Sequence, residues 1–89
     1  MRNVFYINLD KRTKRKESCE KQLKQLEWEF ERFPAIKHKN GAIGCALSHL
    51  KILEMAKEKK LKYVIVMEDD FIIVNIPKFK ETFHNFLNK

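Results

Sequence analysis

The sequence predicts an α/β fold in which a small parallel sheet is covered by helices in the order βαβαβ. Short β-branched and aromatic segments alternate with longer segments of helical periodicity, which is typical of parallel sheets with right-handed crossovers. Apolar residues make up 44% of the chain, and it has only two Gly and two Pro, which indicates an ordered core. At 89 residues, we expect positions 1–89 to form a single domain.

The first half of the chain predicts two strands and one helix. Nearly every residue from 3 to 9 is apolar, as in a strand covered on both faces. Residues 16–27 are predicted to be helical, because Cys19, Leu23 and Leu26 recur at i, i+4 and i+7. Residues 28–33 alternate imperfectly and end at Pro34, which indicates a second strand.

The second half predicts a long helix over residues 44–60, a strand over 63–67 and a last helix opened by Pro77. We expect the strand to be fully buried, and residues 71–74 form a further apolar run. The last helix carries Phe79, Phe83, Phe86 and Leu87 on one side. The long helix has an apolar arc that we expect to face the core, formed by Ile43, Ala46, Leu47, Leu50, Leu53 and Ala56.

Charge and cysteine content narrow the classes of function. Two cysteines, Cys19 and Cys45, are too few for a disulfide framework, and no signal peptide or transmembrane segment is visible, so we expect a cytoplasmic protein. The net charge is +7, and 16 of the 19 Lys and Arg residues precede position 63. This basic part suits a polyanionic partner, which leaves nucleic acid, a peripheral membrane contact and a phosphorylated small molecule open.

Glu68, Asp69 and Asp70 follow the third predicted strand, at the sheet edge where ligands of such folds bind. Adjacent carboxylates repel one another unless a cation or water relieves them, and Mg²⁺ or Mn²⁺ prefers oxygen ligands. The alternatives are a helix N-cap cluster or a solvated turn. The N-cap is disfavoured because an apolar run follows the triplet.

A basic turn follows the first predicted strand and contains Lys11, Arg12, Lys14, Arg15 and Lys16. Cations at a helix N-terminus oppose the helix dipole unless an anion binds there. A solvated basic loop is the alternative. A metal site and a cationic turn at one sheet edge together suit a diphosphate.

The segment from Gly41 to His49 contains two glycines at a helix start, where a ligand can approach the backbone closely. Cys45 and His49 lie at i and i+4, so a Cys–His nucleophilic pair is one interpretation. We favour Cys45 as a small core residue, and Ser48 and His49 as polar lining of the ligand edge. A packed, hydrogen-bonded histidine is the alternative.

Four ordered motifs, FYINLDKR-x₂-R, ERFPAI, GAIGCALSHLKIL and YVIVMEDDF, resemble glycosyltransferase family 25, which includes lipooligosaccharide and procollagen galactosyltransferases. The resemblance implies a GT-A-type fold and a UDP-sugar donor, UDP-galactose or UDP-glucose. It also implies Mn²⁺ (or Mg²⁺) held by the acidic motif, with Glu68 and Asp70 as metal ligands. Residues expected to border the nucleotide sugar are Asn8, Leu9, Asp10, Arg12, Arg15, Gly44, Ser48, His49 and Asp69.

The resemblance also implies a glycan or protein acceptor, as in lipopolysaccharide biosynthesis. Members of that family carry a second half with the acceptor groove and the catalytic base, so no residue here is named as the base. We therefore expect this chain, which is short for the family, to transfer little sugar alone. A non-catalytic nucleotide-sugar-binding remnant and a basic nucleic-acid-binding module are the rival interpretations. Specific nucleic-acid binding is not expected, since the acidic triplet would repel phosphates.

Overall fold

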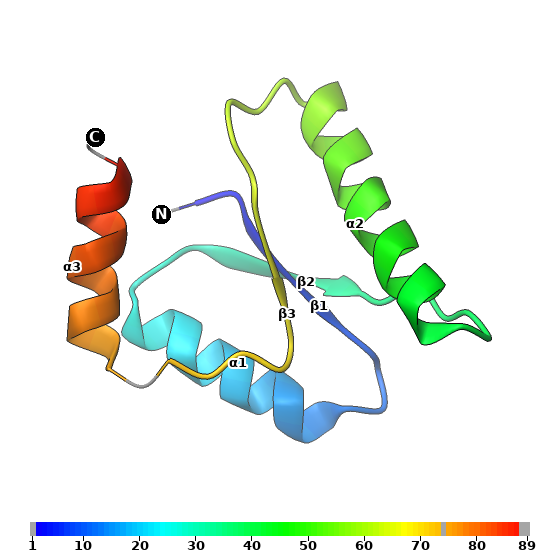
Figure 1. Cartoon of the computed structure of the whole chain (residues 1–89), viewed down its shortest axis with the longest axis horizontal. Coiled ribbons are helices and arrows are strands. Elements are labelled where there is room, and N and C mark those ends of the chain that lie inside the picture. The colour runs from blue at the N-terminus through cyan, green and yellow to red at the C-terminus, as the bar shows by residue number, and fades with distance from the viewer. Residues whose placement is uncertain (1, 74, 88–89) are drawn as a thin grey trace.

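A computed structural model describes residues 2–73 and 75–87 of the chain. Its elements, in order, are β1 (Val4–Asn8), α1 (Thr13–Gln25), β2 (Phe30–Pro34), α2 (Gly41–Glu58), β3 (Ile65–Glu68) and α3 (Ile76–Leu87) (Figure 1). The predicted βαβαβ order and the final helix are confirmed. Helix α2 begins three residues earlier than predicted, because the Asn40 side chain accepts a hydrogen bond from the Ala42 backbone N–H at 3.0 Å and so caps the helix.

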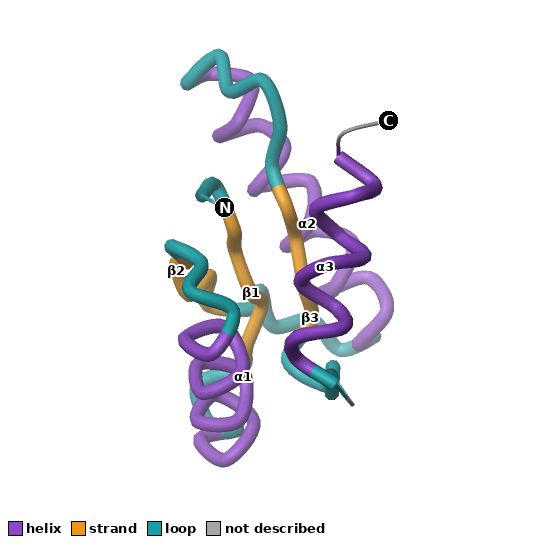
Figure 2. Tube along the Cα trace, turned by 90° about the vertical axis from the view of Figure 1, so that its left-hand side faces the viewer, coloured by secondary structure: helices purple, strands orange, loops and turns teal. Residues whose placement is uncertain are grey.

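The three strands are parallel and lie in the order β2-β1-β3, with β1 in the middle (Figure 2). The register pairs Asn8 of β1 with Pro34 of β2, and Ile7 of β1 with Glu68 of β3. The carboxyl ends of all three strands therefore meet at one edge of the sheet. The residues that follow each strand are brought together there.

The sheet separates two apolar clusters. Because side chains alternate along a strand, Val4 and Tyr6 of β1 face α1 and α3, while Phe5 and Ile7 face α2. On the first face, α3 packs two phenylalanine rings against Trp28, with centroids 6.0 Å and 5.0 Å away. Both faces of β1 are covered, as predicted for a strand buried on each side.

The apolar arc predicted to anchor α2 in the core faces outward instead. The buried residues of α2 are Gly44, Ser48, Ile52 and Ala56, and only Ala56 belongs to the predicted arc. Leucines of that arc are 39–54% exposed. The reason is close packing: the small residues on the buried stripe let the helix backbone approach the segment after β2, where a Cβ on Gly44 would lie 2.6 Å from the Ile36 carbonyl oxygen.

The third strand is less buried than predicted. Residues 65–67 are half-buried and Tyr63, which precedes the strand, is 43% exposed. Among the described strands β3 pairs only with β1, so one of its edges stays open. In α3, Phe79 and Phe83 pack inward as predicted but Phe86 and Leu87 are exposed. The predicted apolar run of residues 71–74 includes Val74, which lies outside the described residues.

No helix in the described part of the chain combines the length and apolar character needed to cross a membrane.

Candidate functional site

A pocket of about 490 Å³ opens at the carboxyl edge of the sheet. Its lining comes from the turn after β1, from the segment that leads into α2 and from the turn after β3. These are the three turns that the parallel topology was predicted to bring together, and the prediction is confirmed. The lining residues are Ile7, Leu9, Lys11, Arg12, Arg15, Ala35, Ile36, Lys37, His38, Gly41, Cys45, Glu68, Asp69 and Asp70.

Asn8 ties these turns together from beneath the pocket. Its side chain is buried and donates to the Arg12 carbonyl oxygen at 3.1 Å and to Asp69 Oδ2 at 2.8 Å. Its Oδ1 accepts a hydrogen bond from Arg32 Nε at 2.9 Å. One amide thus connects the basic turn, the acidic turn and β2, which fixes the position of the pocket floor.

The acidic turn presents its three carboxylates in two directions. Glu68 and Asp70 are exposed at the pocket, whereas the Asp69 side chain is only 9% exposed and accepts hydrogen bonds from Asn8 and from Arg15, the latter at 3.3 Å. The helix N-cap alternative is wrong, because α3 begins at Ile76, six residues after the triplet. Two exposed carboxylates flank a third that is turned into the protein.

The basic turn contributes Lys11, Arg12 and Arg15 to the pocket, at the N-terminus of α1. The ion pair with Asp69 orients Arg15. No acidic residue lies in the first turn of α1, so the positive end of the helix dipole adds to the field of these cations. Lys14 and Lys16 of the same predicted turn do not line the pocket.

Comparison with known proteins decides the family. The family model described as glycosyltransferase family 25 (LPS biosynthesis protein) matches residues 1–42 and 39–89. A glycosyltransferase 25 family member of Drosophila melanogaster is 30% identical over 114 aligned residues, which cover 97% of this chain and 18% of that protein. The chain belongs to glycosyltransferase family 25. A second family 25 member, from Drosophila pseudoobscura pseudoobscura, is 27% identical and the match covers 76% of this chain and 15% of the relative, so the chain spans less than a fifth of either relative's length.

Two residues of the family 25 motif on α2 lie beneath the pocket rather than on its surface. The Ser48 side chain is fully buried; its Oγ accepts from the Ile36 backbone N–H and donates to the Gly44 carbonyl oxygen, each at 2.9 Å. Gly44 allows the close approach to Ile36 described above. Together they hold the segment before α2 against the helix. Their contact with a nucleotide sugar stays a prediction.

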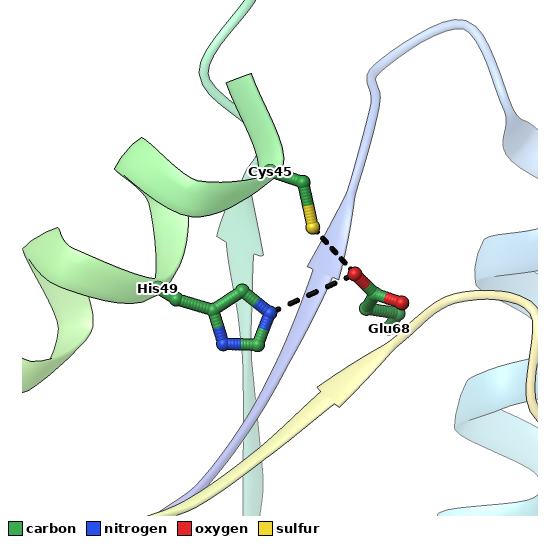
Figure 3. Close-up of side chains that lie close together, drawn as sticks. All are labelled: Cys45, His49 and Glu68. Carbon is green, nitrogen blue, oxygen red and sulfur yellow. Dashed lines mark hydrogen bonds and ion pairs between the residues drawn. The ribbon is translucent and has the colours of Figure 1, made fainter. Parts of the chain in front are cut away.

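Cys45 is not the core residue that the sequence favoured. It is half-buried, lines the pocket and places its Sγ 2.5 Å from Glu68 Oε1 (Figure 3). His49 Nε2 lies 3.7 Å from the same carboxylate oxygen. The hydrogen bond to Glu68 raises the pKa of the Cys45 thiol. A raised pKa keeps the thiol protonated, which is the opposite of what an activated cysteine nucleophile needs.

Arg32 is a site residue that the sequence analysis missed. Its guanidinium donates to the Asn8 carbonyl oxygen at 3.0 Å and to Asp10 Oδ1 at 2.6 Å. Hydrogen bonding and charge attraction by Arg32 hold the pKa of Asp10 below its ordinary value. Asp10 therefore braces the turn after β1 and does not line the pocket. The available signal was a cation near the carboxyl end of the second predicted strand, at the edge of the sheet where ligands were expected.

Lys37 and His38 were also missed and they line the pocket from the segment before α2. No spacing in the sequence distinguishes them from other polar loop residues. Of the predicted binding residues, Leu9, Arg12, Arg15 and Asp69 line the pocket.

Proposed function

We propose that this pocket binds the diphosphate of a UDP-sugar, with UDP-galactose or UDP-glucose as donor, for glycosyl transfer to a glycan or protein acceptor. One observation carries the proposal: a single pocket joins four cationic side chains, those of Lys11, Arg12, Arg15 and Lys37, to two exposed carboxylates. A nucleoside diphosphate with a divalent cation matches both charges at once. Membership of family 25 supports sugar transfer as the reaction class.

The cationic side would bind the phosphate oxygens. Lys11, Arg12 and Arg15 lie at the N-terminus of α1, where an anion also interacts favourably with the helix dipole. Arg15 is held by an ion pair with Asp69, so part of the conformational entropy of its side chain is already lost before a ligand binds. Salt bridges to such a preset guanidinium are geometrically specific.

The carboxylate side fits a hard divalent cation. Glu68 and Asp70 both line the pocket and offer oxygen ligands, the donor type that Mn²⁺ and Mg²⁺ prefer. Asp69 is committed to Asn8 and Arg15, which leaves Glu68 and Asp70 as the ligands in the triplet. When bound, such a cation supplies Lewis-acid neutralisation of the departing diphosphate.

The test is a calorimetric titration of the whole chain with UDP, in Mn²⁺ and in EDTA. We expect tighter binding in Mn²⁺, and we expect Asp70→Asn to abolish the difference. Glu81→Gln, at an exposed position on α3, is the matched control and should keep the Mn²⁺ effect. Affinity that ignores both the metal and Asp70→Asn would show that the acidic turn is structural.

A further inference from the structure

Cys45, His49 and Glu68 converge at one corner of the pocket, and the proposed donor site does not account for the first two. Cys45 and His49 are four residues apart on α2, so they share a helix face. Glu68 is the last residue of β3. Figure 3 shows the thiol and the imidazole pointing at the same carboxylate from across the gap between helix and strand.

The separations suit coordination of one ion. The three potential ligand atoms all lie within 4.8 Å of one another. Around a tetrahedral Zn²⁺, with bonds of about 2.0–2.3 Å, neighbouring ligand atoms lie roughly 3.3–3.8 Å apart. The 2.5 Å contact between Cys45 Sγ and Glu68 Oε1 would open by about 1 Å, while the 3.7 Å between His49 Nε2 and Glu68 Oε1 already fits this range. This shift is small for side chains that are half-buried or exposed.

The ligand types select the class of metal. A thiolate, an imidazole and a carboxylate suit Zn²⁺ and Co²⁺, whereas Mg²⁺ and Mn²⁺ favour oxygen ligands alone. Three protein ligands leave a fourth tetrahedral position, as in zinc sites that keep a place for water or substrate. Cys45 and Glu68 both line the pocket, so a ligand in the cavity would have access to an ion held there.

We propose that Cys45, His49 and Glu68 form a binding site for Zn²⁺ or a similar borderline divalent cation, which shares Glu68 but no other ligand with the Glu68 and Asp70 pair. Metal binding releases the thiol proton to solvent and replaces the hydrogen bond between Cys45 and Glu68 with two metal–ligand bonds. Because Glu68 serves both sites, the two cations compete. Zn²⁺ at this corner therefore withdraws Glu68 from the Mn²⁺ that we propose to assist UDP binding.

The experiment uses Co²⁺ as a spectroscopic substitute for Zn²⁺ on the reduced full chain without UDP. We expect a thiolate-to-cobalt charge-transfer band in the near ultraviolet and the strong visible bands of tetrahedral Co²⁺. Equimolar Zn²⁺ should remove both, and Mn²⁺ should not. Cys45→Ser should abolish the charge-transfer band, and His49→Ala should weaken Co²⁺ binding at least about tenfold, the lower limit for loss of even an outer-shell partner.

Two control variants keep the result specific. Cys19→Ala removes the other thiol, which is buried in the α1 face of the core, and should retain the band. Asp70→Asn should also retain it, so failure of this site and failure of the UDP site are separable. Circular dichroism checks that each variant is folded. Absence of the charge-transfer band, its survival in folded Cys45→Ser, or its loss in folded Cys19→Ala would overturn the proposal.

Discussion

Replacing Gly44 by alanine tests whether α2 lies as close to the pocket wall as the structure shows. A Cβ at this position would lie 2.6 Å from the Ile36 carbonyl oxygen and 3.4 Å from two atoms of His38. Ile36 cannot retreat freely, because its backbone N–H donates to the buried Ser48 hydroxyl at 2.9 Å. At Gly41, at the start of the same helix, an added Cβ would meet nothing within 4 Å.

Both substitutions change helix propensity, but only one of them creates a steric clash. Alanine improves helix propensity over glycine by up to about 1 kcal/mol inside a helix, as at Gly44, and by less at Gly41, the first residue of α2. Only Gly44→Ala adds an overpacking cost, which is about 1–3 kcal/mol. The propensity gain at Gly44 offsets up to about 1 kcal/mol of that cost, and the clash lies in the upper part of the range because the Cβ would meet a backbone oxygen. The Gly44→Ala protein should therefore be less stable than the Gly41→Ala protein by about 1–2 kcal/mol.

Urea unfolding followed by the fluorescence of Trp28 measures this difference, because Trp28 is the single tryptophan and lies buried against two rings of α3. With a denaturant dependence of about 1–3 kcal/mol/M, the midpoint of Gly44→Ala should fall below that of Gly41→Ala by roughly 1 M. Equal midpoints, or a more stable Gly44→Ala protein, would refute the close approach of α2 to Ile36.

Other substitutions test the burial of α2, the Asn8 amide and the two thiols. Ile52→Ala should lower the free energy of unfolding in urea by about 2–5 kcal/mol, because Ile52 is fully buried. Leu50→Ala, on the outward face of α2, should lower it by less than about 0.5 kcal/mol. Similar losses in the two variants would indicate that the predicted apolar arc faces the core after all. Asn8→Ala should cost about 1–3 kcal/mol by the same assay, because a carboxylate and a guanidinium each lose a hydrogen-bond partner; an unchanged midpoint would contradict this. At pH 8 a thiol reagent should label half-buried Cys45 in the folded protein, slowed by its raised pKa, and Cys19 only after unfolding, since burial shields Cys19 and raises its pKa to about 11. Equal labelling rates for the two thiols in the folded protein would count against this. As pH rises from about 9 to about 11, Cys19 loses its proton in the unfolded chain before it does so in the folded protein. The free energy of unfolding should therefore fall over that range, and it should fall less in Cys19→Ala.

Much of the pocket could be predicted from local signals combined with one topological rule. The apolar segments and helical periodicities indicated the strands and helices, and parallel strands end at a common edge. That reasoning placed Arg12, Arg15 and the acidic triplet near one another. The apolar run that forms β1 and the turn residues after it could be recognised without knowledge of distant contacts.

The sequence by itself therefore determined the order of elements, the edge at which the chemistry gathers and the family of the chain. The tertiary structure alone decided which stripe of α2 is buried. The small residues Gly44, Ser48 and Ala56 lie on the buried stripe because they allow close packing, although the opposite stripe is more apolar. The tertiary structure also decided that Arg32 clamps Asn8 and Asp10, and that Cys45 and His49 meet Glu68. These outcomes depend on contacts between residues far apart in the chain, whereas periodicity and propensity report only on neighbours along it.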